Sequence, residues 1–262
     1  MIFYFSGTGN SKYCAQVLAE RLDDISINLC SVDFNSLNID YSKGVGFVFP
    51  VYAWGVPPIV LEFIKRLPEK LVSELKENDV IIWMVATCGD DTGETDKMMA
   101  SALDKRGLCL SGVWSVTAPN IYVLLPGFDV DSDEVRINKI KALDERLSHI
   151  AALIKKGEWA TDIHRGSMSW LKTAVVYPLF TKWGIAYKKW HVTDACTGCG
   201  LCTQACPVNN IIMKDGRPVW GKDCLSCVSC YHECPHHAIE YGSATKGKGQ
   251  YLRRMRPIFS RK

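Results

Sequence analysis

The sequence has no uninterrupted apolar run of the roughly 20 residues that a membrane-spanning helix needs. The longest candidate, residues 170–187, is broken by Lys172 and Lys182. Residues 1–5 are apolar, but they have neither the basic residues nor the long apolar region of an export signal. We therefore expect no transmembrane segment and a cytoplasmic location.

The sequence also carries little net charge, because 31 Lys and Arg oppose 28 Asp and Glu and leave a formal charge of +3. This balance gives no general case for nucleic acid binding. The charge is uneven, since seven Lys or Arg and no acid follow residue 240, which leaves the rest of the chain at about −4. We expect this basic tail to be a solvated chain end rather than a docking strip for an acidic partner.

A disulfide framework does not fit the 12 cysteines, because eight of them stand at metal-ligand spacing and we expect a reducing compartment. The other four are predicted to be free thiols that act as small buried apolar residues. These are Cys14, Cys30, Cys88 and Cys109.

Two cysteine blocks form an internal repeat. Residues 196–207 read CTGCGLCTQACP, and residues 224–235 read CLSCVSCYHECP, with an offset of 28 residues. Each block has the spacing C-x2-C-x2-C-x3-C-P. The repeat resembles bacterial two-cluster ferredoxins, in which three thiolates of one block bind one iron–sulfur cluster and the fourth binds the other.

This resemblance implies two 4Fe-4S clusters. One ligand set would be Cys196, Cys199, Cys202 and Cys234, and the other would be Cys224, Cys227, Cys230 and Cys206. Zinc is the alternative, but zinc modules normally use two C-x2-C pairs per site, which leaves tandem triplets unexplained. His232, His236 and His237 are expected on the surface or behind the ligands, since eight cysteines already fill both sites.

Upstream of these blocks, apolar runs alternate with helical patterns. The expected strands are residues 1–5, 25–30, 44–51, 80–86 and 112–117, and the expected helices are residues 11–22, 57–67, 94–106 and a long one ending at Gly157. The alternation predicts an α/β fold with a five-stranded parallel sheet and helices on both faces. Ligands of such sheets bind at the carboxyl ends of the strands, where residues 6–11, 51–56, 87–93 and 118–126 would meet.

The loop after the first strand is predicted to bind a phosphate. It consists of Ser6, Gly7, Thr8, Gly9, Asn10 and Ser11. Its hydroxyls, its amide and the N–H groups of the following helix suit a monophosphate. The loop has neither the G-K-[ST] ending of a P-loop nor the third glycine of the dinucleotide fingerprint. The alternative is an ordinary strand-to-helix turn built from small residues.

Two later loops are candidates for contact with a planar ring. They contribute Pro50, Val51, Tyr52, Ala53, Trp54 and Gly55, and Thr87, Cys88, Gly89 and Asp90. An aromatic pair such as Tyr52 and Trp54 can stack on a flavin, although plain packing is the usual role of such a pair. Cys88 is expected to line the pocket rather than to react, because no adjacent histidine or cationic cluster would lower its pKa.

Residues 1–156 resemble flavodoxin. The SGTGNS loop is similar to the flavodoxin phosphate loop, and the loops at Tyr52 and at residues 87–93 stand where that family holds its isoalloxazine ring. The resemblance implies FMN as a cofactor. We expect an aromatic-rich connector at residues 157–190, a ferredoxin-like domain at residues 191–243 and the tail at residues 244–262.

The connector is predicted to be a helix or an extended arm packed between the two domains, because an unstructured linker would not be so aromatic. An interfacial membrane helix is the alternative, with Lys172, Lys182, Lys188 and Lys189 as its basic flank. Pro178 breaks its short apolar face, which favours the packed arm.

The whole chain resembles the flavodoxin–ferredoxin fusion proteins of anaerobic bacteria and archaea. That resemblance implies an electron carrier in which FMN and two clusters serve a redox partner protein. The alternative is an FMN-dependent oxidoreductase that reduces a quinone, a ferric chelate or a similar small substrate. Only Asp90 and Tyr122 are candidate acid–base groups near the flavin edge, which favours the carrier. A redox sensor is a third possibility, but the chain has no DNA-binding or catalytic output module.

Overall fold

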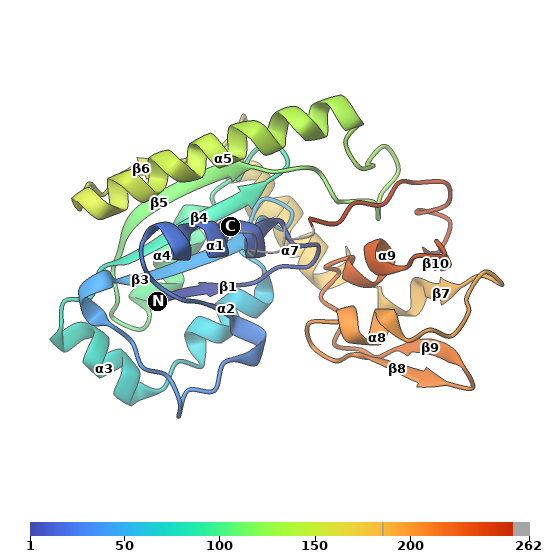
Figure 1. Cartoon of the computed structure of the whole chain (residues 1–262), viewed down its shortest axis with the longest axis horizontal. Helices are drawn as coiled ribbons and strands as arrows, with labels where there is room; N and C mark the ends of the chain where they lie inside the picture. Colours follow the sequence, from blue (N-terminus) through green and yellow to red (C-terminus); the bar gives the residue numbers. More distant parts are fainter. Residues whose placement is uncertain (185, 254–262) are drawn as a thin grey trace, which may run out of the picture.

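The computed structural model describes residues 1–184 and 186–253, without the side chain of Trp183. The last nine residues of the predicted basic tail therefore lie outside the described residues. The chain forms a large α/β part followed by a smaller cysteine-rich part at its side (Figure 1).

The large part is built on a parallel sheet of six strands in the order β2-β1-β3-β4-β5-β6. The strands are β1 (Ile2–Tyr4), β2 (Ser26–Asn28), β3 (Val45–Pro50), β4 (Ile82–Cys88), β5 (Leu110–Thr117) and β6 (Thr161–Asp162). The five predicted strands are present, but the predicted number was wrong. Thr161 and Asp162 add a sixth, exposed strand at the edge beside β5, where no apolar run marks it.

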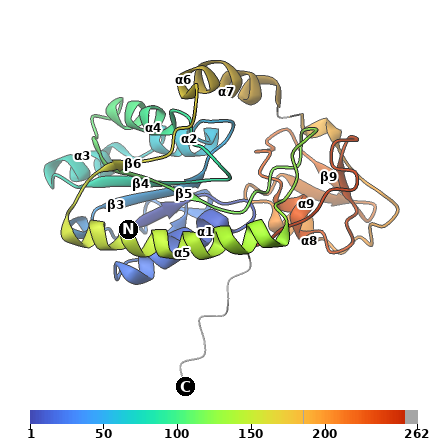
Figure 2. The same ribbon diagram turned by 90° about the horizontal axis from the view of Figure 1, so that it is seen from above.

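Helices cover both faces of the sheet, as predicted (Figure 2). One face carries α1 (Asn10–Arg21) and α5 (Asp133–Lys156), and the other carries α2 (Pro58–Lys65), α3 (Glu69–Glu77) and α4 (Thr95–Asp104). Successive side chains of β1 point to opposite faces of the sheet. Ile2 and Tyr4 therefore pack in the core with α1 and α5, whereas Phe3 packs in the core on the other face. The sequence did not predict α3, because only Val72 and Leu75 of its nine residues are buried.

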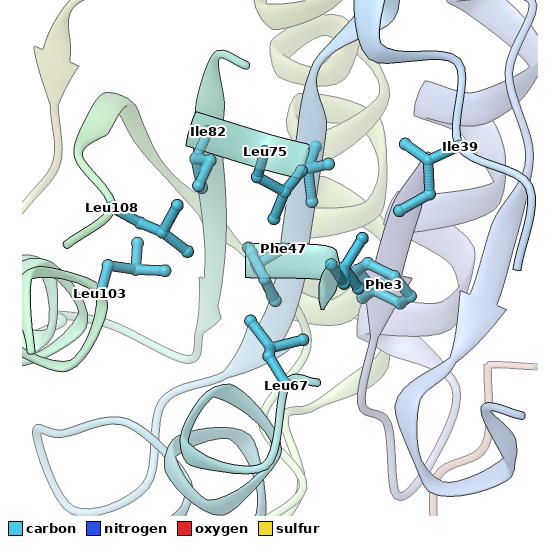
Figure 3. Close-up of a pocket in the computed structure, with 10 residues that line it drawn as sticks. Phe3, Ile39, Phe47, Leu67, Leu75, Ile82, Leu103 and Leu108 are labelled. Carbon is cyan, nitrogen blue, oxygen red and sulfur yellow. The ribbon is translucent and has the colours of Figure 1, made fainter. Parts of the chain in front are cut away.

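The core between the sheet and the second helix layer contains a small apolar pocket (Figure 3). Its ten lining residues include Phe3, Phe47, Leu75 and Leu103, and none of the ten has a polar side chain. It offers no group to orient a polar ligand, so we treat it as part of the core.

After β6, residues 169–184 of the connector form one helical segment. It consists of α6 (Ser169–Leu171), the π-helical turn η3 (Lys172–Val176), α7 (Tyr177–Leu179) and the π-helical turn η4 (Phe180–Gly184). Pro178 has no backbone N–H to donate, and the two π turns flank it. Three short 3₁₀ turns lie elsewhere, at η1 (Leu29–Ser31), η2 (Tyr41–Lys43) and η5 (Tyr187–Lys189). None of the helices in the described part of the chain is long and apolar enough to cross a membrane.

The cysteine-rich part contains two antiparallel strand pairs and two short helices. They are β7 (Trp190–Val192) with β10 (Ile239–Tyr241), β8 (Ile211–Lys214) with β9 (Arg217–Trp220), and the helices α8 (Leu201–Ala205) and α9 (Ser229–Glu233). The helices are 28 residues apart, like the cysteines. The positive-φ positions Gly198, Gly200 and Asn209 recur at the same offset as Ser226, Val228 and His237. The sequence repeat is therefore also a backbone repeat.

Candidate functional site

The predicted phosphate loop joins β1 to the start of α1. Gly9 has φ 101°, which favours glycine, and its N–H donates to Ser6 Oγ at 3.1 Å. A Cβ at Gly9 would also collide with the carbonyl oxygen of Arg253. The loop thus turns the chain tightly into α1, whose first N–H groups have no partners within the helix.

The polar side chains of this loop differ in what they already bind. Asn10 donates to Pro119 O at 3.0 Å, and Ser11 shares a hydrogen bond of 2.7 Å with Thr87. Thr8 is only 3% exposed, yet its hydroxyl has no partner among the described residues. A buried hydroxyl without a partner is costly, so a phosphate oxygen at Thr8 fits this loop.

The loop after β3 is a two-residue turn in which Tyr52 and Gly55 exchange backbone hydrogen bonds of 2.9 Å. Ala53 and Trp54 occupy its centre with φ values of 44° and 65°, a conformation that usually requires Asn or Gly. Backbone strain of this kind persists only where the surroundings impose it.

The two aromatic residues of that loop point to different neighbours. The Trp54 indole N–H donates to Asp91, and Lys172 lies 5.0 Å from the centre of its ring. Tyr52 instead packs edge-on against Phe180 at 6.2 Å, and burial followed by the Cys227 and Cys224 thiols raises its pKa well above the usual value. Both rings therefore contact the connector, Trp54 at Lys172 and Tyr52 at Phe180, and Tyr52 also lies near the cysteine-rich part.

The loop after β4 is tied to elements that the sequence did not connect with it. Thr92 N donates to His164 O at 2.9 Å, and Lys139 of α5 donates to Gly89 O at 3.0 Å. Burial, then the nearby acids Asp91 and Asp90, raises the pKa of Cys88 to about 12, so this thiol stays protonated.

The first cysteine set comprises Cys196, Cys199, Cys202 and Cys234. All four line one pocket, together with apolar residues that include Met213 and Ile239. Cys199 is exposed, so the pocket reaches the surface. The N–H of Ala238 donates to Cys234 Sγ at 3.3 Å, a contact of the kind that stabilises a thiolate.

The second cysteine set comprises Cys224, Cys227, Cys230 and Cys206. Burial raises the pKa of Cys227 to about 12, with a backbone contact at Ser229 opposing the rise and the thiols of Cys224 and Cys206 adding to it. Burial, then Cys227, raises the pKa of Cys230 well above its usual value, and Cys224 and Cys206 contribute in the same direction, so Cys206 of the first block lies near the second triplet. Asn210 N donates to Cys206 Sγ at 3.2 Å, the repeat-related equivalent of the contact at Cys234.

Two buried indole N–H groups beside the second cysteine set have no conventional hydrogen-bond acceptor. The indole N–H groups of Trp190 and Trp220 have no partner of hydrogen-bond length in the described part of the chain. Trp190 lies near Cys224 and Trp220 lies near Cys230. Burial raises the pKa values of these two thiols, and the indoles act in the opposite direction. Sulfur atoms of a cluster would accept from them, so the surroundings fit an iron–sulfur group. Within residues 1–184 and 186–253, no three His, Cys, Asp or Glu side chains could hold a single metal ion. The case for clusters therefore rests on the spacing of the cysteines and these surroundings.

The phosphate loop and the second cysteine set touch each other. A Cβ at Gly7 would collide with the carbonyl oxygen of Cys227 and would lie 3.1 Å from its Cβ. Leu225 and Cys227 also pack against the core of the large part. Glycine at position 7 therefore allows the two loops to meet, a contact that joins residues 220 positions apart.

A C-terminal segment closes this junction from the other side. Tyr251 N donates to His232 Nδ1 at 3.1 Å, and Arg253 N donates to Thr8 O at 2.9 Å. His232 Nε2 lies 2.8 Å from Ile121 O, and burial lowers the pKa of His232 to about 4, so the ring stays neutral. His232 thus links α9, the loop after β5 and the C-terminal segment.

The remaining predicted residues have plainer positions. Cys14 is buried, and its pKa rises to about 12 through burial, whereas Cys109 is exposed, contrary to the prediction of a buried thiol. Asp90 is exposed and lies in an open loop. Burial, then Tyr241, raises the pKa of Tyr122 to about 12, so its hydroxyl stays protonated.

Comparisons with known proteins agree with this two-part organisation. Residues 1–122 match a family model described as a flavodoxin domain, and residues 195–239 match one described as a 4Fe-4S dicluster domain. No curated protein matches the chain. A solved structure of the Trp repressor binding protein from Bacillus subtilis is 17% identical, with coverage of 61% of this chain and 99% of that chain and a TM-score of 0.40. The two domain matches, in this order, match the organisation of a flavodoxin–ferredoxin fusion and support an iron–sulfur flavoprotein of electron transfer.

Proposed function

We propose that this protein relays electrons between FMN, two 4Fe-4S clusters and a redox partner protein in the cytoplasm. The observation that carries the proposal is the contact between Gly7 of the phosphate loop and Cys227 of the second cysteine set. Electron transfer slows steeply with distance, so this contact favours direct exchange between the two parts of one molecule.

The positions of the cysteine sets support an order for the relay. The second set adjoins the phosphate loop, whereas the first set opens to the surface at Cys199. We infer that the second set would hold the cluster nearer to the flavin, and that the first set would hold the cluster from which a partner could be reached. FMN exchanges one or two electrons when bound, and each cluster exchanges one, which suits the division of a two-electron event into single steps.

The chain's own residues would hold the groups and tune them. The Thr8 hydroxyl and the N–H groups at the start of α1 would bind the phosphate. The buried indoles of Trp190 and Trp220 would donate to sulfur in the second set, and Met213 and Ile239 would limit water at the first set.

We assign residues 1–156 to the flavin domain, 157–190 to the connector, 191–243 to the cluster domain and 244–262 to the tail. The connector supports a relay rather than direct reduction of a small substrate. Tyr177 donates to Val56 O at 2.7 Å, and Phe180 packs against Tyr52, so the helical segment covers the loop where the ring edge would lie.

Cysteine variants purified without oxygen test the proposal. The wild-type protein should contain about eight iron atoms and one FMN. Cys227→Ser should lose about half of the iron and stop electron exchange between flavin and iron. Cys199→Ser should also lose about half of the iron, but it should keep that exchange, because the second set is intact.

Two results would contradict the proposal. Zinc in place of iron and acid-labile sulfide would remove the clusters altogether. Loss of flavin–iron exchange in Cys199→Ser, with normal exchange in Cys227→Ser, would reverse the proposed order.

A further inference from the structure

The helical segment of residues 168–184 is held firmly by its inner face. Thr173 Oγ1 donates to Trp54 O at 2.7 Å and accepts from Glu94 N at 2.9 Å. Tyr177 donates to Val56 O at 2.7 Å. The segment is thus anchored to the flavin-ring loops by buried and half-buried contacts, and these contacts fix which face it turns outward.

The outer face of the segment is apolar and exposed. Five of the 14 exposed large apolar residues of the described chain lie within 12 residues here, with exposures of 38–66%. They are Met168 and Trp170 at the start of the segment, and Val175, Val176 and Leu179, which share one stripe at helical spacing. Figure 2 shows α6 and α7 as the outermost elements on their side of the sheet, beyond α2 and α4. This outer face is therefore a projecting ridge rather than a groove that could receive a peptide.

The segment and the residues next to it in the sequence carry only positive charge, whereas Asp91, Glu94 and Asp96 of the large part lie against its inner side. Residues 163–193 contain no Asp or Glu but include five Lys or Arg. Arg165 and Lys172 are paired with Asp96 and Asp91, whereas Lys188 and Lys189 are exposed beyond the end of the segment. Apolar side chains next to unneutralised lysines are typical of helices that lie at the interface of an anionic bilayer.

We propose that this ridge docks the protein on an anionic lipid surface. Val175, Val176 and Leu179 would enter the boundary between head groups and acyl chains, and Lys188 and Lys189 would contact the phosphates. A docked molecule would hold the segment between the lipid and the ring loop at residues 52–55, because the segment packs directly on that loop. The proposal does not depend on the proposed electron relay.

Co-sedimentation of the full chain with vesicles tests this inference. Binding to phosphatidylcholine vesicles that contain phosphatidylglycerol should exceed binding to phosphatidylcholine alone by about tenfold or more, and salt should weaken it. The double variant Val175→Ser/Leu179→Ser should lose most of the binding, and so should Lys188→Glu/Lys189→Glu. Circular dichroism and flavin content should stay unchanged, because these side chains lie outside the core.

Ile212→Ser is the matched control, because Ile212 is 63% exposed on the hairpin of the cluster domain, away from the ridge. It should bind vesicles as the wild type does. Equal binding to neutral and anionic vesicles, or unchanged binding of both double variants, would overturn the proposal. A dimer in solution that Val175→Ser/Leu179→Ser dissociates would also overturn it, since a second copy would then cover the ridge.

Discussion

Replacement of Gly7 by alanine would test the junction between the two parts with the smallest possible change. The φ angle of Gly7 is not positive, so alanine brings no backbone strain. Its methyl group, however, would lie within 3.0 Å of the carbonyl oxygen of Cys227, a separation that Cβ atoms essentially never show. The atom in the way is backbone, so one loop has to move.

The size of the effect follows from this collision. The two loops must separate by roughly half an ångström or more, and overpacking of a well-packed contact typically costs about 1–3 kcal/mol. We expect Gly7→Ala to lower the free energy of unfolding by this amount. We also expect slower electron exchange between flavin and iron, because the phosphate loop and the second cysteine set are pushed apart.

Gly157→Ala is the control that separates lower stability from slower electron exchange. Gly157 ends α5 with φ 69°, and no atom lies within 4 Å of the position of its Cβ. Alanine there should cost about 1–2 kcal/mol through backbone strain alone. Denaturant unfolding and anaerobic stopped-flow absorbance of both variants provide the comparison, and Gly157→Ala should keep the wild-type exchange rate.

The reasoning would be refuted if Gly7→Ala matched the wild type in both stability and exchange rate. It would also be refuted if Gly157→Ala slowed the exchange as much as Gly7→Ala does, since general destabilisation would then explain the effect.

Two further predictions concern buried polar groups without partners. Thr8→Val removes an unsatisfied hydroxyl, so the flavin-free protein should be as stable as the wild type or slightly more stable. The variant should bind FMN about tenfold or more weakly in a fluorescence titration. Equal FMN affinity would show that Thr8 does not contact the phosphate. Trp220→Phe should make the reduction potential of one cluster more negative by about 40 mV, which corresponds to the loss of one hydrogen bond of about 1 kcal/mol to sulfur. A redox titration followed by EPR measures this shift. An unchanged potential would show that the indole does not donate to the cluster.

Much of the architecture could be read from local patterns. Strands β1, β3 and β4 are buried apolar runs, and the glycine at position 157 marks the end of α5 as expected. The sixth strand could not be found this way, because Thr161 and Asp162 are exposed and are held by pairing with β5 and by the Arg146 side chain of α5. Helix α3 was missed for a similar reason, since its sequence is mostly charged and only two of its residues are buried.

The composition of the site was more predictable than its assembly. The cysteine spacing predicts both sets, including the exchange of Cys206 and Cys234 between the two blocks, because ligand spacing is a local constraint. In the structure Cys234 lines one pocket with Cys196, Cys199 and Cys202. The meeting of Gly7 with Cys227 depends on how two domains dock, and no local signal carries that information. The different orientations of Tyr52 and Trp54 likewise depend on Asp91 and on the connector.

The central claim is that flavin and clusters exchange electrons within one molecule. Rapid anaerobic photoreduction of the flavin, followed by separate detection of the flavin and cluster absorbance at several protein concentrations, tests it most directly. The contact between the phosphate loop and the second cysteine set predicts a rate that does not change with protein concentration. A rate proportional to protein concentration would mean that electrons pass between molecules, and it would contradict the account.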